Sequence, residues 1–198
     1  MENTTFTQPE TSSSSTKLAS LDILSLNKAS LFSVDECNLI TDNCIEDLWL
    51  PSRVVGEDAL HKSKRQKLRG EPEGFPFDNI RTITKQANDE IYDFRLLGII
   101  DQDFPQVYRY EEGDYYNLHL DLSPMATTRK LTFIVNLSDP NDYEGGEIKF
   151  LNTDTSSADL NEQGSILIFP AFLPYSIEEV TKGKKDIIVG CIHGAVFR

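Results

Sequence analysis

Apolar side chains recur every three or four residues in two stretches of the first half of the chain, which is the spacing of a helix with one buried face. The first stretch opens with a capping-box signature, in which Ser33 would accept from the first turn and Glu36 would reach back. Its apolar positions are Val34, Cys37, Ile40, Cys44 and Leu48. We therefore predict a helix that begins after Ser33 and ends near Trp49.

The second helical stretch begins at Asp78, which has the side chain of an N-cap residue, and continues to Phe94. The apolar positions on its expected inner face are Ile80, Ile83, Ala87, Ile91 and Phe94. The two stretches predict two helices that each bury one face.

Residues 57–78, between the two predicted helices, are polar and irregular, and we interpret them as a solvated loop or lid. The segment carries five cations, which are Lys62, Lys64, Arg65, Lys67 and Arg69. A patch for an acidic substrate is the functional alternative for this basic segment (62–69). His61 lies at its edge and is expected to be exposed.

After Gly98 the pattern changes to short segments rich in β-branched and aromatic residues, which is typical of strands. Five segments have this character: FPQVYRY (104–110), RKLTFIVNLS (129–138), GEIKFL (146–151), GSILIFP (164–170) and KDIIVGCI (185–192). Turn sequences rich in Gly, Asp, Asn and Pro separate them. Two helices followed by closely spaced strands predict an α+β fold with an antiparallel sandwich or barrel.

The N-terminal 17 residues are rich in Ser and Thr and nearly free of large apolar side chains, so we expect a disordered tail there (1–17). The remainder (18–198) is predicted to form one domain. Within it, residues 28–100 would supply helical support and a lid, and residues 101–198 the β core.

Composition excludes several classes of function. Hydrophobic residues make up 39% of the 198 positions, which is enough for a core. The chain has 32 acidic and 19 basic residues and a net charge of −13, so we expect no nucleic-acid or anionic-membrane partner. No apolar run is long enough to span a bilayer, and the polar N-terminus does not resemble a secretory signal. Three sparse cysteines suit a reducing compartment, so we predict a cytoplasmic protein.

The strongest chemical signal is the sequence YNLHLD at residues 116–121. Side chains at i and i+2 of a strand point to the same face, so His119 and Asp121 can present an imidazole nitrogen and a carboxylate oxygen to one metal ion. Such a pair supplies two of the three ligands in the facial triad of non-heme Fe(II) enzymes. Taken alone the pair is a weak signal, and a structural role is its alternative.

Four linked stretches give the pair a context: RYEEGDYYNLHLD (109–121), RKLTFIVNLSDPNDYEGGEIKF (129–150), GSILIFPAF (164–172) and VTKGKKDIIVGCIHG (180–194). In wording, order and spacing they resemble the 2-oxoglutarate/Fe(II)-dependent oxygenases, in particular the bacterial prolyl-4-hydroxylase-like, PKHD-type hydroxylases. The resemblance implies a double-stranded β-helix (jelly-roll) core with N-terminal helices packed on one sheet. It also implies Fe(II) as the metal, 2-oxoglutarate as cosubstrate and ascorbate as a candidate reductant.

The resemblance assigns roles to four positions. His119 and Asp121 fall on the first two metal ligands. Tyr110 falls on a tyrosine expected to hydrogen-bond the 2-oxoglutarate carboxylate. Lys185 falls on the basic residue that pairs with the distal carboxylate of 2-oxoglutarate, where many relatives have arginine.

The chain departs from the family at the third metal ligand. The family reads, in essence, Phe-Pro-Ser-Phe-Leu-Leu-His, whereas residues 169–175 read FPAFLPY, so that Tyr175 takes the place of the histidine. Tyr175 is the candidate third ligand, although its ordinary pKa near 10 and the preference of phenolate for Fe(III) oppose that role. Alternatives are Glu178 or Glu179 after a local shift, water, and His193. The last is disfavoured because eight strand residues, about 26 Å, separate it from Lys185.

Three functions are compatible with this sequence. The first is an oxygenase that couples 2-oxoglutarate decarboxylation to C–H hydroxylation of a small molecule or of a peptide or protein side chain. The second is a catalytically silent binding module, because one metal ligand is missing. The third is a different oxidative outcome at the same site. The sequence makes no prediction of the oligomeric state.

Overall fold

The computed structural model describes residues 31–52, 60–151 and 160–196. The predicted tail (1–17) lies outside the described residues. Two helices and twelve strands are described, and every strand pair is antiparallel. Within the described residues, no helix combines the length and the apolar character needed to cross a bilayer.

The first helix, α1 (Val34–Asp42), begins with the predicted capping box. The Ser33 hydroxyl accepts from the Glu36 backbone N–H at 3.3 Å, and the Glu36 carboxylate accepts from the Ser33 N–H at 2.8 Å. The predicted helix end near Trp49 was wrong, because α1 stops at Asp42. The apolar residues that follow are carried by a separate 3-10 turn, η1 (Glu46–Leu48).

The second helix, α2 (Phe77–Ala87), continues into η2 (Asn88–Tyr92), a single π-helical turn. Asp78 does not cap it; the residue lies in the first turn and accepts a hydrogen bond from Arg81. The expected inner position Ile91 is 46% exposed. A π turn holds more residues than an α turn, so the apolar face predicted with α-helical spacing rotates away from the core at this point.

The strands form two sheets. The large sheet has the order β1-β3-β5-β12-β7-β10, and β4 and β8 also pair with β12. Its strands are β1 (Leu50–Pro51), β3 (Lys64–Lys67), β4 (Leu96–Gly98), β5 (Gln106–Glu111), β7 (Arg129–Asn136), β8 (Tyr143–Gly145), β10 (Ile166–Pro170) and β12 (Val180–Gly194). The small sheet has the order β2-β6-β11-β9. Its strands are β2 (His61–Lys62), β6 (Tyr115–His119), β9 (Ile148–Phe150) and β11 (Tyr175–Ile177).

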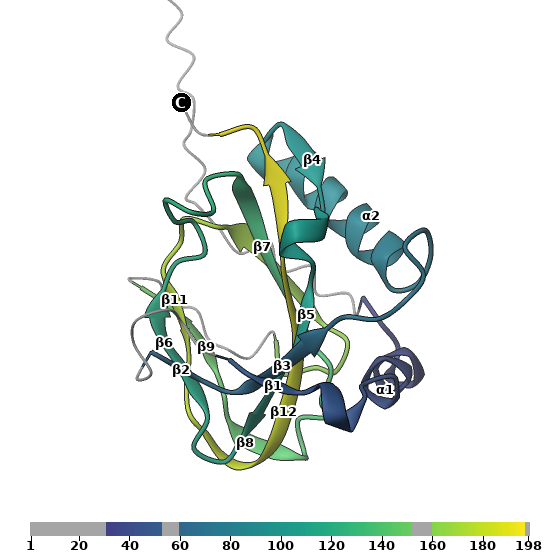
Figure 1. Ribbon diagram of the computed structural model, residues 1–198, viewed down its shortest axis with the longest axis vertical. Helices are drawn as coiled ribbons and strands as arrows, with labels where there is room; N and C mark the ends of the chain where they lie inside the picture. Colours follow the sequence, from purple (N-terminus) through teal and green to yellow (C-terminus); the bar gives the residue numbers. More distant parts are fainter. Residues whose placement is uncertain (1–30, 53–59, 152–159, 197–198) are drawn as a thin grey trace, which may run out of the picture.

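The two sheets face each other, and both helices lie on the side of the large sheet that faces away from the small one (Figure 1). One apolar cluster joins α1 and α2 with the large sheet, and a second fills the space between the sheets. Successive side chains of β12 point alternately into the two apolar clusters, since Ile188 belongs to the first cluster and Ile187 to the second. This alternation places Lys185, Val189 and Cys191 on the inner face of β12.

The arrangement is a mostly antiparallel, jelly-roll-like fold with two helices. Each of the five predicted strand segments contains a strand, in β5, β7, β9, β10 and β12. The interpretation of residues 57–78 as a solvated loop was wrong for the part from His61 to Lys67, which forms β2 and β3. The segment from His61 to Lys67 buries polar side chains such as Ser63 and Gln66, whose hydrogen bonds are satisfied, so the hydropathy of the segment did not reveal the two strands.

Candidate active site

His119 and Tyr175, which are far apart in the sequence, face each other across β6 and β11. The two residues are register partners, and their ring centroids are 4.3 Å apart. Asp121 follows the end of β6, and the Tyr175 hydroxyl donates to its Oδ2 at 3.2 Å. The fold therefore brings the histidine, the carboxylate and the phenol to one end of the space between the sheets.

The His119 ring leaves one nitrogen free for a ligand. Its Nδ1 lies 2.8 Å from the Asn117 carbonyl oxygen, which fixes the proton on that nitrogen. Its Nε2 is buried and has no hydrogen-bond partner within the described parts of the chain. Burial, the largest effect, lowers the pKa of His119, so the ring is neutral. An unpartnered buried polar atom costs about 1–3 kcal/mol, and a neutral imidazole with a free lone pair is the form that ligates metals.

Donors surround the Asp121 carboxylate. Thr132 donates to its Oδ2 at 2.7 Å, on the oxygen that also accepts from Tyr175. Arg129 donates to the Asp121 backbone carbonyl at 3.0 Å, and its Nη1 lies 3.8 Å from the carboxylate Oδ1. The carboxylate is thus held in one orientation, with Oδ1 less fully engaged than Oδ2.

Tyr175 is fully buried among aromatic rings, including those of Phe150 and Phe169. Burial first, and then the charge of Asp121, raise the pKa of Tyr175 well above its ordinary value. In this arrangement the side chain is a neutral phenol that donates a hydrogen bond. Ligation by its oxygen would require the loss of that proton.

Tyr110 and Lys185 are register partners on β5 and β12, and both are buried. The Lys185 ammonium donates to the Gly146 carbonyl at 2.7 Å and lies 4.9 Å from the centre of the Tyr143 ring. Lys185 is 2% exposed and forms no ion pair with any described residue. Burial lowers its pKa to about 8. A buried cation of this kind lacks the anion that would offset its desolvation.

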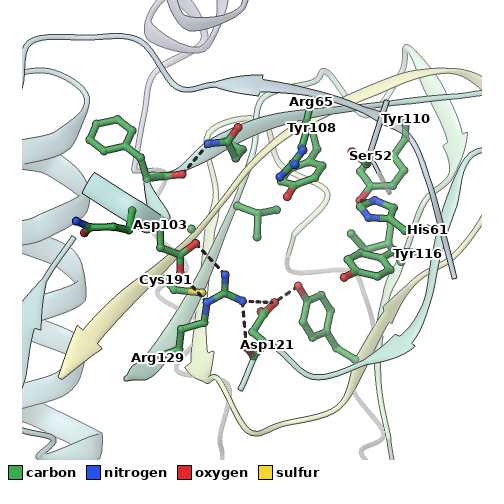
Figure 2. A pocket seen from close by; sticks show the side chains of 17 residues that line it. Ser52, His61, Arg65, Asp103, Tyr108, Tyr110, Tyr116, Asp121, Arg129 and Cys191 are labelled. Atoms are coloured by element: carbon green, nitrogen blue, oxygen red, sulfur yellow. Dashed lines mark hydrogen bonds and ion pairs between the residues drawn. The ribbon is translucent and has the colours of Figure 1, made fainter. Parts of the chain in front are cut away.

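A pocket of about 250 Å³ opens beside Tyr110 and Asp121 (Figure 2). Tyr108, Tyr110 and Tyr116 line one wall, and Asp121 and Arg129 line another. The pocket therefore has aromatic walls and a polar end next to Asp121, where a small molecule or a side chain could meet the metal-ligand candidates.

Comparison with known proteins shows which family the chain resembles. Residues 105–193 match the family model of the 2OG-Fe(II) oxygenase superfamily. Over this region, which is somewhat less than half of the chain, the sequence resembles that superfamily. A PKHD-type hydroxylase of Prochlorococcus marinus is 38% identical over 86 residues, which cover 43% of this chain and 39% of the relative. A PKHD-type hydroxylase from another strain of that species is 26% identical over 171 residues, which cover 84% of this chain and 76% of the relative. The chain spans about two fifths of the length of the first of these relatives.

Solved structures of prolyl hydroxylases share the fold. A Pseudomonas putida prolyl-4-hydroxylase superposes with a TM-score of 0.63 at 15% identity, covering 84% of this chain and 90% of that one. The 2OG complex of a viral collagen prolyl hydroxylase from Paramecium bursaria Chlorella virus-1 also has a TM-score of 0.63, at 20% identity. The match covers 84% of this chain and 93% of that one. A Trichoplax adhaerens prolyl hydroxylase in complex with a hypoxia inducible factor peptide fragment has a TM-score of 0.59, at 13% identity. The match covers 81% of this chain and 76% of that one.

The superfamily implies Fe(II) and 2-oxoglutarate, and the donor set of this chain fits the metal at two positions. The unpartnered Nε2 of His119 and the carboxylate of Asp121 are suitable ligands. The third position carries the Tyr175 phenol, and the described residues contain no group of three His, Cys, Asp or Glu side chains that could hold a metal. Ligation by Tyr175 stays a prediction.

The other candidates for the third ligand lie elsewhere. Glu178 pairs with Lys149 at 3.0 Å on the outside of the small sheet, and Glu179 is exposed. His193 places its Nε2 3.0 Å from Asp103 and its Nδ1 2.9 Å from Thr128. All three would have to leave their present surroundings to reach the superfamily's metal position.

The expectation that His61 is exposed was wrong, since it is 6% exposed. Its ring stacks on Tyr116 at 3.7 Å between centroids, and Tyr116 stacks on His119 at 3.4 Å. Its Nε2 lies 3.1 Å from the Tyr110 hydroxyl and 2.9 Å from that of Ser63, and burial lowers its pKa to about 3. The pairing of β2 with β6 creates this stack, and a two-residue strand leaves no periodic signal in the sequence.

Sequence reasoning also missed the ion pair between Arg129 and Asp103. The guanidinium donates to both carboxylate oxygens, at 2.6 and 2.8 Å, and the same carboxylate contacts His193. Arg129 therefore links Asp103 to Asp121 behind the metal-ligand candidates. The only sequence signal was the place of Arg129 at the start of a predicted strand.

Proposed function

We propose that the protein is a prolyl-4-hydroxylase-like 2-oxoglutarate- and Fe(II)-dependent oxygenase that hydroxylates a C–H bond of an amino-acid side chain or small molecule. The observation that carries the proposal is the buried, unpartnered Nε2 of His119 beside the Asp121 carboxylate. An imidazole nitrogen and a carboxylate are two of the three ligands in the facial triad of non-heme Fe(II) enzymes, which supports the proposal.

His119 and Asp121 would hold the iron. When bound, Fe(II) supplies the site at which 2-oxoglutarate and dioxygen react. Thr132 and Arg129 keep the Asp121 carboxylate in place, and the stack of His61 and Tyr116 on His119 fixes the imidazole plane. Tyr175, as a phenol, stabilises the charge of Asp121 from the third position.

Lys185 would bind the distal carboxylate of 2-oxoglutarate. Its ammonium is buried without an anion, so a carboxylate that arrives there restores a charge-assisted bond in a site already shielded from water. Tyr110, its cross-strand partner, would hydrogen-bond the same cosubstrate through its hydroxyl, which now contacts His61.

The surroundings of Asp121 support one side chain or a small molecule as the substrate. The pocket beside Asp121 has a volume of about 250 Å³, which admits one side chain or a small metabolite. A related fold is solved with a peptide fragment bound, which supports a peptide or protein side chain as the substrate.

An anaerobic titration with Fe(II) and 2-oxoglutarate tests the proposal. We expect the metal-to-ligand charge-transfer band in the unmodified chain and its loss in the variant His119→Ala. In air, with ascorbate, the unmodified chain should form succinate, and the product should gain one oxygen. Absence of both the band and succinate would contradict the proposal and favour a silent binding module. A product without one added oxygen would indicate the different oxidative outcome.

A further inference from the structure

The large sheet continues past the pocket through β3 and β1. Arg65 and Lys67 of β3 are register partners of Tyr108 and Gln106 of β5, and Leu50 of β1 is the partner of Arg65. Register partners in a sheet share a face, so these side chains lie on the face that carries the pocket-lining tyrosines. Figure 2 draws Arg65 next to Tyr108 at the pocket wall.

A groove of about 570 Å³ runs along this part of the sheet. Its lining includes two exposed leucines, Leu48 at 49% and Leu50 at 62% exposure, and the cations Arg65, Lys67 and Arg69. Arg65 and Gln106 line both this groove and the pocket beside Asp121. The groove therefore leads to the mouth of the candidate active site.

The charges of this groove are unusual for so acidic a chain. Lys62 and Lys64, in the same segment, pair with Asp114 and Glu111. Arg65, Lys67 and Arg69 form no ion pair with any residue in the described ranges. Lys67 instead lies 4.1 Å from the centre of the neutral Phe104 ring. Three cations without an ion pair among the described residues thus line one groove in a protein of net charge −13.

We propose that this groove binds an acidic, extended segment of a polypeptide substrate, whose reacting side chain enters the pocket beside Asp121. The inference rests on the proposed function and specifies its substrate class. From residue 65 to residue 69 the chain advances about 13 Å at about 3.3 Å per strand residue, the length of about four residues of an extended ligand. The two leucines provide apolar contacts that carboxylate-bearing peptides can use and that a sugar-phosphate backbone cannot.

Fluorescence anisotropy with the full chain, Mn(II) and 2-oxoglutarate tests the groove without turnover. The probe is a labelled twelve-residue peptide with a central proline, flanked by alternating glutamate and leucine. We expect it to bind, and a matched peptide with lysine for glutamate not to bind. The double variant Lys67→Gln/Arg69→Gln should weaken binding about tenfold, the loss of two ion pairs of about 0.7 kcal/mol each. The control Lys149→Gln/Lys182→Gln removes the same charge from ion pairs outside the groove and should leave binding unchanged.

The proposal on the groove and the proposal on function fail separately. The charge-transfer band with Fe(II) and 2-oxoglutarate should be the same in the unmodified chain and in both double variants. If the band forms but the acidic peptide does not bind, or binds the Lys67/Arg69 variant as tightly, the groove proposal is overturned and the oxygenase remains. Tighter binding of a twelve-nucleotide single-stranded DNA than of the peptide would also overturn it. If the band is absent from the unmodified chain, the oxygenase proposal fails whatever the peptide does.

Discussion

Replacing Lys185 by methionine removes a charge that the fold buries and that the cosubstrate is expected to neutralise. Burial lowers the pKa of Lys185 from its ordinary 10.5 to about 8. At about 1.36 kcal/mol per pKa unit, the buried charge costs about 3 kcal/mol of folding free energy near neutral pH. Methionine has a similar length and no charge. The variant also loses the donor to the Gly146 carbonyl, which costs about 1–2 kcal/mol.

Without cosubstrate, the Lys185→Met variant should therefore be more stable than the unmodified chain by about 1–2 kcal/mol in free energy of unfolding. For a chain of this size that corresponds to a rise in Tm of about 2–8 °C. Lysine at this position therefore lowers stability, which is expected of a residue kept to bind a ligand. The folding penalty of Lys185 depends on pH. Between about pH 8 and 10.5 the unfolded chain holds the Lys185 proton and the folded chain does not, so the penalty shrinks as pH rises through that window.

Thermal unfolding with Mn(II), with and without 2-oxoglutarate, measures both effects. At a concentration of about 100 times Kd, the cosubstrate should stabilise the unmodified chain by about 2.7 kcal/mol, and the Lys185→Met variant by almost nothing. Lys149→Met is the matched control, because Lys149 is an exposed lysine in a surface ion pair. A Lys185→Met variant that is less stable than the unmodified chain, yet still stabilised by 2-oxoglutarate, would refute the reasoning.

Three further predictions follow from the same contacts. The affinity for 2-oxoglutarate, measured calorimetrically, should be constant below about pH 8 and fall up to tenfold per pH unit above it as Lys185 loses its proton. Among the described residues, the Gly146 carbonyl and the Tyr143 ring contact that ammonium and Glu147 acts on it from farther away, so an unchanged affinity at pH 9.5 would contradict the assignment. Tyr175→His should tighten Mn(II) binding by about tenfold or more, because a neutral imidazole would replace a protonated phenol opposite His119. Equal Mn(II) affinities of the variant and the unmodified chain in titration calorimetry would argue against a metal at this position. His61→Ala should cost about 2 kcal/mol in urea denaturation through loss of a buried ring and its stacking on Tyr116, and no change in the midpoint would show that the stack does not hold His119 in place.

Local signals in the sequence were sufficient for much of the fold. The capping box at Ser33 and Glu36 acts within four residues, and the strand segments carry their own β-branched pattern, so both could be predicted. The proximity of Tyr175 to His119 was predictable through the family resemblance, because the matching stretches imply the family's strand register, which the local pattern of the chain does not reveal.

Tertiary structure alone decided the contacts that surround the site. His61 meets Tyr110 across 49 residues of sequence, Arg129 meets Asp103 across 26, and His193 meets Asp103 across 90. The groove along Arg65 and Lys67 exists because β3 pairs with β5, although its sequence reads as a solvated loop. Polar side chains can satisfy their hydrogen bonds either in water or with a distant partner, so the sequence pattern does not distinguish the two. Apolar side chains gain free energy by leaving water, so most of the core could be predicted, whereas the polar network could not.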